Sequence, residues 1–442
     1  MTLMTISCTS ASPTLEPSTT MALATSTTQS SATSTIRQDA VGGYLVKVDP
    51  ATLGELASAS PIPVSANSWN TVSQDESIVI NWEQRGTHDR YAQVWNTDSW
   101  TFVSEFEVDG GPHDVEVIHD GSYYAYARTG KWTKWDLTTG RRSEVGEWTP
   151  GLSFWDVRVL ASGKLVALST DETSNEGQVS LMDLTTGSTS SIAVGTVQRV
   201  DEESGYFDGA YQIPRVDSPG VVWSADSLIL AYADVPEMIE VDLTTGEVVT
   251  HDLAVTSWLD RLWAYWTPAA RAKGPELGTY SSAAMSDDGR HLFISGNQYS
   301  VAENADGALI EENEHLGVWV VDIETGEVVA RHDTPIQFVR ETGAGVVGVN
   351  TVSFDPWTEE IYLLEDDYEV IQVPVTVSGG CDLTDGGGHL ICFSYPPSNL
   401  GPVTVSVLET GTLETVAQRQ IGSEDTLHSN GVLEDWLPLT GT

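Results

Sequence analysis

The chain has few basic residues and no long apolar run. Its 442 residues include 20 Lys and Arg against 64 Asp and Glu, which gives a formal net charge of −44 at pH 7. A nucleic-acid-binding protein needs basic surface to displace counterions from phosphates, so this charge argues against that class. An anionic membrane surface would also repel the chain. No run of about 18 apolar residues occurs, so we expect no membrane-spanning helix.

Cysteine is scarce as well, with three residues in the chain. Cys381 and Cys392 flank Gly386 and Gly387, a pair favoured in two-residue hairpin turns. Counting outward from that turn places the two cysteines opposite each other, where Cα atoms about 4.5–5.5 Å apart allow a disulfide. We predict this disulfide, with two reduced buried thiols as the alternative. A disulfide indicates an oxidising compartment and hence an exported protein.

Residues 1–42 differ from the remainder because they are mostly Ser, Thr, Ala and Pro. Such a segment buries too little apolar surface to fold, so we expect a disordered leader or tether. Thr5-Ile-Ser-Cys8 loosely resembles a lipobox, with Thr where Leu is usual and only seven preceding residues. A lipid anchor on Cys8 and a plain leader remain the two alternatives. The first would place the protein on the outer face of the cytoplasmic membrane.

What the chain does have is a repeated strand-ending corner. The full copies pair a leading Asp with a closing Gly, and one copy is degenerate: Asp136-Leu-Thr-Thr-Gly140, Asp183-Leu-Thr-Thr-Gly187, Asp242-Leu-Thr-Thr-Gly246, Asp322-Ile-Glu-Thr-Gly326 and Leu408-Glu-Thr-Gly411. The Asp side chain bonds backbone amides two residues on, and Gly takes the positive φ that closes the turn. β-branched runs flank each corner, which indicates a hairpin.

A second hairpin precedes each of these corners, so the repeating unit has four strands. Such units, repeated at roughly 40–50 residues, are typical of a β-propeller. We predict an all-β propeller over residues 43–442, in preference to a sandwich or a solenoid. Seven blades are favoured. An eighth remains the alternative, if the surplus hairpin at Tyr44–Leu56 pairs with Thr426–Thr440 and so removes exposed strand edges.

The turns between strands resemble those of known propellers. Met285-Ser-Asp-Asp-Gly-Arg-His-Leu292 resembles the turn of TolB-type repeats, and Gly110-Gly-Pro-His-Asp-Val-Glu-Val-Ile-His-Asp-Gly121 is similar to the opening of YVTN-type blades. With the corner motif, these segments place the chain near the broad superfamily of WD40-like, TolB-like and YVTN-type propellers. The resemblance is one of fold, and folds of this kind carry many functions.

Candidate ligand-binding residues lie on the strands expected to line the central channel. His113 and Asp114 open one such strand, and the resemblance to YVTN-type blades implies that this His faces the channel. His titrates near neutral pH and serves as a ligand or as an acid–base group. Trp155, Asp156 and Trp223 fall near two further inner strands. For the Trp residues, packing between blades is the competing interpretation, and for His113 it is a bond to a neighbouring blade.

The insertion at residues 254–278 contains Trp258, Trp263 and Trp266, which we include among the ligand-binding candidates. Trp258, Leu262, Tyr265 and Trp266 fit one face of a short amphipathic helix, which would cap the channel, bind a partner or pack onto the blades. A second, acidic insertion comprises Asn304–Gly307 and Glu311–His315. Oxygen-rich loops can bind Ca²⁺, but the spacing of an EF-hand is absent, and we interpret the insertion as a solvated loop. No metal-binding or cofactor motif is recognisable, so we expect no metal, no cofactor and no assigned catalytic residue.

These features favour a monomeric, exported or lipid-anchored propeller that binds a protein or a small ligand such as a glycan without catalysis. The alternative is an extracellular hydrolase or lyase with its site at the channel mouth, drawing on His113, Asp114, Trp155 and Asp156. A cytosolic assembly platform is a third reading and requires free thiols at Cys381 and Cys392. Convergent carboxylate and His side chains with shifted pKa values would favour the enzyme.

Overall fold

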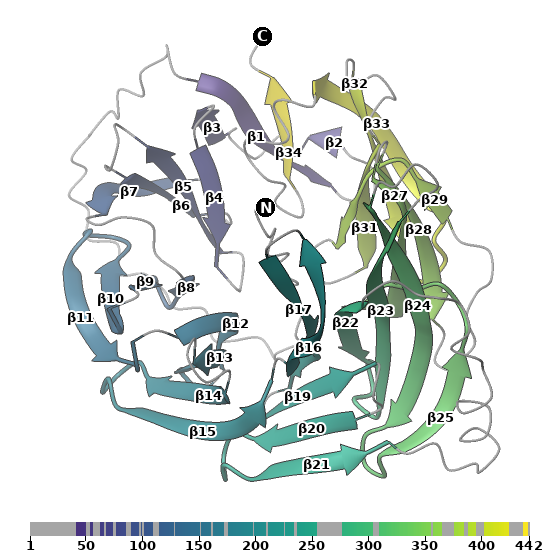
Figure 1. Cartoon of the computed structure of the whole chain (residues 1–442). Helices are drawn as coiled ribbons and strands as arrows, with labels where there is room; N and C mark the ends of the chain where they lie inside the picture. The colour runs from purple at the N-terminus through teal and green to yellow at the C-terminus, as the bar shows by residue number, and fades with distance from the viewer. Residues whose placement is uncertain are drawn as a thin grey trace, which may run out of the picture.

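In the computed structural model, seven four-stranded antiparallel sheets surround one axis as the blades of a propeller (Figure 1). The structure describes residues between Val41 and Thr440, except for short breaks and the longer stretches 56–61, 85–89, 109–114, 254–275, 304–308, 365–374, 395–401 and 424–435. Every regular element in the described part is a strand. The predicted all-β propeller with seven blades is confirmed.

Each blade is a meander that begins at the axis and ends at the rim. Blades 1 and 2 comprise β4 (Ser68–Val72), β5 (Ile78–Gln84), β6 (Arg90–Asn96), β7 (Thr101–Val108), β8 (Val115–His119), β9 (Ser122–Tyr126), β10 (Lys131–Asp136) and β11 (Arg142–Glu147). Blades 3 and 4 comprise β12 (Leu152–Val159), β13 (Lys164–Asp171), β14 (Glu176–Asp183), β15 (Thr189–Thr196), β18 (Gly220–Trp223), β19 (Ser227–Tyr232), β20 (Glu237–Asp242) and β21 (Val248–Asp252).

The remaining blades repeat the same order. Blade 5 comprises β22 (Glu276–Met285), β23 (His291–Glu303), β24 (Leu309–Asp322) and β25 (Glu327–His332). Blade 6 comprises β26 (Phe338–Thr342), β27 (Gly345–Phe354), β28 (Trp357–Leu364) and β29 (Val375–Val377), and blade 7 comprises β30 (Cys381–Leu383), β31 (His389–Ser394), β32 (Pro402–Glu409) and β33 (Thr415–Ser423).

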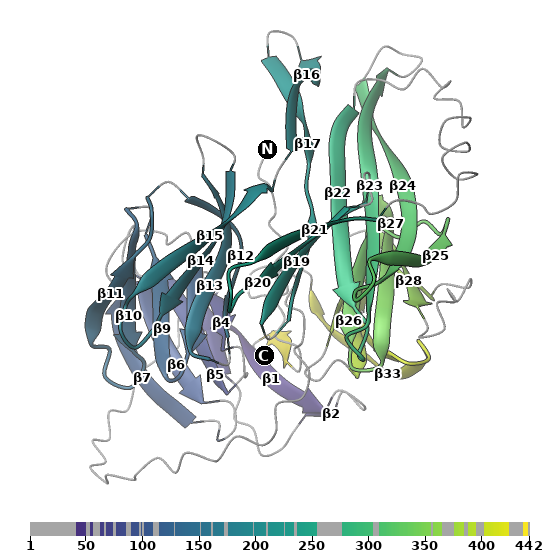
Figure 2. The same ribbon diagram turned by 90° about the horizontal axis from the view of Figure 1, so that it is seen from below.

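A further sheet joins the two ends of the chain. It contains β1 (Val41–Asp49), β2 (Gly54–Glu55), β3 (Ile62–Ser65) and β34 (Trp436–Thr440). β1 pairs antiparallel with β34, with Tyr44 opposite Leu439, so the pairing of the surplus hairpin with the C-terminal segment, which the sequence left as an alternative, is present. Both views place this sheet between blades 1 and 7 (Figures 1 and 2). The propeller therefore has seven regular blades, with a sheet of mixed termini in the gap between the first and the last.

The repeated corner has the geometry that its sequence predicts. In blade 2, Oδ1 of Asp136 accepts hydrogen bonds from the backbone N–H groups of Thr138 and Thr139, at 3.0 and 2.7 Å. Gly140 closes the turn at φ 66°. The hydroxyl bond from Thr139, together with these backbone bonds, holds the carboxylate in its charged form and lowers the pKa of Asp136.

The degenerate copy in blade 7 has a different frame from the one expected. Glu409, and not Leu408, takes the position that Asp has in the full copies, because the Glu409 carbonyl accepts a hydrogen bond from the N–H of Leu413 at 2.7 Å. Leu413 then occupies the closing position at φ 56°, which Gly fills elsewhere. Its side chain is 5% exposed and packs in the core between blades 6 and 7. Burial of this side chain offsets the unfavourable backbone conformation, which is why sequence alone misplaces the corner.

Apolar side chains fill the spaces between neighbouring blades. Between blades 1 and 2, for example, Ile80 and Trp82 pack against Ile118 and Tyr123, and all four side chains are at most 2% exposed. Since each blade buries both faces in this way, its strands contain nearly continuous apolar runs. Burial of this surface is the main favourable contribution to holding the ring together.

Three features of the fold depart from the sequence-based expectation. A hairpin of β16 (Arg199–Asp208) and β17 (Tyr211–Asp217), which the sequence did not reveal, rises from the ring beside the tall strands of blade 5 (Figure 2). The interpretation of Glu311–His315 as a loop is wrong, because these residues belong to β24 and pair with β23 from Val301 to Asn297. The insertion was expected to extend to Gly278, but β22 already begins at Glu276.

Candidate functional site

The last residues of the inner strands meet at one mouth of the ring. Every blade runs the same meander from axis to rim, so the inner strands share one direction and their following turns lie on one face. We call this the turn face. In blades 2, 3, 4, 5 and 7 a backbone bond joins the inner turn to the outer corner, as between Leu137 N–H and Gly121 O at 3.0 Å and between Leu243 N–H and Asp226 O at 2.8 Å. These backbone hydrogen bonds fix the turns and corners of the turn face relative to one another.

Two predicted residues come together at this mouth. Asp156 in β12 of blade 3 accepts a hydrogen bond at Oδ2 from Nε1 of Trp223 in β18 of blade 4, at 2.7 Å. The same oxygen lies 3.3 Å from Nε of Arg158, and the two charged side chains are 23% and 13% exposed. Asp156 is thus fixed from two sides, by a neighbouring blade and by its own strand.

Further charged groups from blades 5 and 6 reach the same region. Burial, together with the nearby charge of Asp287, raises the pKa of Glu341, in β26, to about 7, although the Arg158 guanidinium opposes both effects. Asp287 lies in the turn that follows β22. A guanidinium from blade 3 therefore acts on a carboxyl group from blade 6. We call Asp156, Arg158, Trp223, Asp287 and Glu341 the mouth cluster.

Two of the predicted aromatic residues, Trp155 and Trp223, lie in the described part of the chain, and both pack against a core. Trp223 is 6% exposed and belongs to the core between blades 3 and 4. Trp155 is half-buried against the same core, and its Nε1 lies 3.4 Å from Oγ1 of Thr170. The structure therefore gives both indoles a packing role, and Trp223 in addition supports Asp156.

Several candidates fall outside the described residues, and their roles stay predictions. These are His113, Asp114, Trp258, Trp263, Trp266 and the lipidation candidate Cys8. In the part of the chain that the structure describes, no group of three or more His, Cys, Asp or Glu side chains is arranged to hold a metal ion. Nor does a helix there have the length and apolarity needed to span a bilayer.

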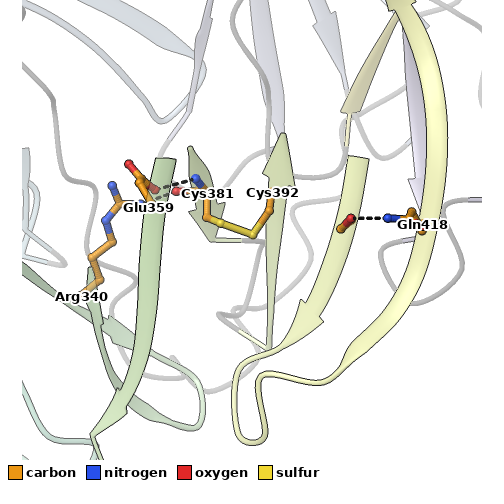
Figure 3. The surroundings of a disulfide bond; sticks show 6 residues. Arg340, Glu359, Cys381, Cys392 and Gln418 are labelled. Atoms are coloured by element: carbon orange, nitrogen blue, oxygen red, sulfur yellow. Dashed lines mark hydrogen bonds between the residues drawn. A yellow bond between two sulfur atoms is a disulfide. The ribbon is translucent and has the colours of Figure 1, made fainter. Parts of the chain in front are cut away.

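The cysteine pair has the predicted register. Cys381 lies opposite Cys392 in the β30–β31 ladder, and a disulfide joins them (Figure 3). Their Cα atoms are 4.0 Å apart, closer than expected. In the neighbouring pair of residues, Phe393 N–H donates a hydrogen bond to Gly380 O at 2.9 Å. The cysteines therefore form a non-hydrogen-bonded pair, the position in an antiparallel ladder where opposed Cα atoms lie closest.

Because of this register, the backbone of Cys381 points away from β31 and is bound by blade 6. Its N–H donates to Oε2 of Glu359 at 3.3 Å, and its carbonyl accepts from a terminal nitrogen of Arg340 at 2.8 Å (Figure 3). Glu359 is 7% exposed, so this charge-assisted bond is shielded from water. The disulfide therefore lies at the junction of blades 6 and 7.

Sequence reasoning missed Arg158, Asp287 and Glu341. A signal was present, because Asp287 lies in the Ser286–Gly289 turn used to recognise the repeat, and Arg158 lies two residues from Asp156. Residues adjacent to the ends of inner strands meet in a propeller whatever their separation in sequence. Considering those positions together would have found this cluster.

Comparison with known proteins gives only structural likenesses at low sequence identity. No family model matches the chain, and no curated protein matches it. Similar solved structures include a eukaryotic initiation factor, at 10% identity and TM-score 0.49 over 86% of this chain and 84% of that one. BamB from Moraxella catarrhalis gives 14% identity and TM-score 0.41 over 79% and 88%. Oligogalacturonate lyase in complex with manganese gives 10% and 0.41 over 74% and 85%.

Proposed function

We propose that this chain is an exported, non-catalytic binding module whose ligand is held at the mouth cluster. One observation carries the proposal: Asp156 in blade 3 is preoriented by Trp223 of blade 4 at 2.7 Å. Beside it, Arg158 acts on the pKa of Glu341 in blade 6, as does Asp287 in blade 5. Preoriented polar groups lose little conformational entropy on binding, so they favour recognition.

The balance of charge at the cluster indicates the ligand chemistry. Asp156, Asp287 and Glu341 contribute three carboxyl groups, and Arg158 contributes one guanidinium. A ligand that brings a positive group near Glu341 would relieve the repulsion from Asp287. A basic side chain of a partner protein fits this requirement, and the net charge of −44 would attract such a partner over a longer range.

Binding of an N-acetylated hexalysine amide at 150 mM salt tests this site. We expect Glu341→Gln and Asp287→Asn each to raise Kd by about fivefold, because each removes a carboxylate close to the bound cation. The matched control is Glu327→Gln, which removes the same charge from an exposed position on the outer strand β25. Equal effects of all three substitutions would reduce the interaction to non-specific attraction and contradict the proposal.

The exported state is supported by the disulfide at Cys381 and Cys392. The proposal includes two alternative forms of export, secretion and a lipid anchor on Cys8. Intact-mass analysis of protein from the native host, before and after reduction, distinguishes them. A diacylglyceryl mass on Cys8 would establish the anchor, whereas two free thiols and an unmodified Met1 would contradict export.

One observation favours the enzymatic alternative. A carboxyl group with a pKa of about 7, such as Glu341, is suited to donating a proton at neutral pH. In that case a lactone or a glycan would be cleaved at the mouth, and Glu341→Gln would abolish turnover. Unchanged turnover in that variant would eliminate Glu341 as the acid.

A further inference from the structure

Blade 5 rises above blade 6, so the upper part of one face of its sheet is left uncovered by that blade (Figure 2). Its contacts with blade 6 include Ser282 in β22, whose Oγ accepts from Val339 N–H at 3.1 Å, and Ser295 in β23, whose Oγ donates to Gln337 O at 3.2 Å. Beyond these serines, β22 continues back to Glu276 and β23 continues on to Glu303. The face that blade 6 covers lower down therefore extends above it.

Strand register identifies the residues on this uncovered face. Residues opposite each other in a ladder, and those two apart on a strand, share one face. Tyr280 lies two residues from Ser282 and opposite Asn297, which in turn lies opposite His315. Tyr299 lies opposite Asn313 in the next row. We call Tyr280, Asn297, Tyr299, Asn313 and His315 the raised face.

The raised face offers an aromatic surface to solvent. The Tyr280 side chain is 45% exposed, although it lies on the innermost strand of its blade. Its ring stands edge-on to that of Tyr299, with centroids 5.4 Å apart and planes at 88°. Such a contact fixes the orientation of the exposed ring. A fixed, exposed aromatic ring is a stacking surface for the C–H face of a sugar ring.

Planar polar groups lie beside the aromatic pair. Oδ1 of Asn297 lies 2.9 Å from Nδ1 of His315, and Asn297 is 2% exposed and so acts as a buried support. Burial lowers the pKa of His315, so the ring is neutral near pH 7. Because Oδ1 only accepts, Nδ1 carries the ring proton and the second nitrogen, Nε2, is an acceptor. Asn313 is exposed and adds an amide with both a donor and an acceptor. Sugar hydroxyls, which donate and accept, match this set.

The strand that carries Tyr280 is held on its other edge by the raised hairpin. Oδ1 of Asp217 accepts from Thr279 N–H at 2.8 Å. Ser218 then donates to Thr279 O at 2.7 Å and accepts from Ser281 N–H at 3.0 Å. These bonds flank Tyr280 on both sides along the strand. The backbone beneath the aromatic pair is therefore fixed before any ligand binds.

We propose that the raised face of blade 5 binds a neutral oligosaccharide. The site is separate from the mouth cluster and does not depend on the function proposed for it. A neutral glycan is favoured over a polyuronate because the chain carries a net charge of −44, which repels anionic polymers. No charged side chain is needed for the recognition, since ring stacking and hydrogen bonds to hydroxyl groups supply it.

Titration calorimetry with cellohexaose, maltohexaose, xylohexaose and chitohexaose tests the proposal, with hexagalacturonate as the anionic control. We expect at least one neutral hexasaccharide to bind, and Tyr280→Ala to weaken that binding by about tenfold through loss of the stacking surface. His315→Ala should weaken it by about fivefold. Hexagalacturonate should bind more weakly than the neutral probe that binds.

Phe102→Ala is the matched control. Phe102 is 36% exposed and also forms an edge-on contact, with Trp95 at 5.4 Å, but it lies on the outer strand of blade 1. Binding should be unchanged in this variant. Circular dichroism of each variant checks that it folds. Absence of binding by all four neutral probes at millimolar concentration, or equal losses in Tyr280→Ala and Phe102→Ala, would overturn the proposal.

Discussion

Oδ2 of Asp156 in blade 3 accepts a 2.7 Å hydrogen bond from Nε1 of Trp223 in blade 4. The two residues are 67 positions apart in sequence, and the bond joins two inner strands at the mouth of the ring. Because the acceptor is a carboxylate and the indole is buried, this bond contributes to stability as well as to the orientation of Asp156.

Replacing Trp223 with Phe should therefore lower the free energy of unfolding more than the same replacement at a comparable tryptophan without such a bond. Trp148 is the matched control, because it is also 6% exposed and its buried Nε1 has no hydrogen-bond partner. Both changes remove a similar volume, but only Trp223→Phe breaks a hydrogen bond, whereas Trp148→Phe removes a buried N–H that has no partner. We expect Trp223→Phe to lower the free energy of unfolding by about 1–2 kcal/mol more than Trp148→Phe, measured by urea denaturation. Equal losses would show that the bond adds no net stability.

The raised pKa of Glu341 predicts a pH dependence of stability. Its carboxyl titrates at about 7 in the folded protein against 4.5 in the reference state, so the folded protein binds more protons between those values. Stability must therefore fall as pH rises from about 4.5 to 7. Glu341→Gln mimics the neutral form and should remove this fall. The difference in the free energy of unfolding, variant minus wild type, should increase by about 1–2 kcal/mol from pH 5 to pH 8, a value that allows for the partial exposure of the carboxyl group.

Urea denaturation across pH 4.5–8.5 measures this effect. The control is Glu327→Gln, which makes the same change in net charge at the exposed outer strand β25. If both variants gain the same stability at pH 8, the effect comes from the net charge of −44 and not from the environment of Glu341. A wild-type profile with no fall in this window would show that the carboxyl is not perturbed.

Local sequence signals were sufficient for the fold. The corner at Asp136 uses bonds within four residues, so its geometry is encoded where it stands. The pairing of Cys381 with Cys392 was also predictable, because a short hairpin fixes its register by counting from the turn. Both features depend on neighbours in sequence, and the repetition of such units then identifies the propeller.

The site was less predictable because it depends on contacts between blades. Glu341 is influenced by Arg158 and Asp287 only because inner strands of three blades end at one mouth. The degenerate corner was misplaced because packing of Leu413 outweighs the usual preference for Gly. The acidic segment at Glu311–His315 was misread as a loop, since its pairing with β23 overrides its polar composition.

The corner motif itself predicts a test in blade 2. Asp136→Ala removes an acceptor from two backbone N–H groups, whereas Asp136→Asn keeps the Oδ1 acceptor. Asn96 already fills this position in blade 1, where its Oδ1 accepts from Ser99 N–H at 2.8 Å. We expect Ala to cost about 1 kcal/mol and Asn less than half of that, by analogy with helix N-caps. Similar costs for Ala and Asn would show that the side-chain bonds are unimportant.

The same residue predicts a change at acid pH. The folded-state pKa of Asp136 is lowered from 3.8, so its ionised form stabilises the fold above that pH and the contribution is lost as pH falls below it. The difference between wild type and Asp136→Ala should therefore shrink on acidification from pH 5 to pH 3. Thermal unfolding over that range measures it, and a constant difference would contradict the assigned role of the carboxylate.

The disulfide between blade strands β30 and β31 predicts a specific loss on reduction. It closes a loop with a sequence separation of 11, for which the restriction of the unfolded chain is worth about 2–3 kcal/mol. Since Cys381 is also bound by Glu359 and Arg340, its displacement would disturb the junction with blade 6. We expect Cys392→Ser to lower the free energy of unfolding by at least this amount, with hydrogen exchange rising first in blades 6 and 7.

The cysteines are 4% and 0% exposed, so dithiothreitol should reduce the native protein slowly and the urea-unfolded protein fast. Rapid reduction without unfolding, or exchange rising equally in all blades, would contradict a buried bond at this junction.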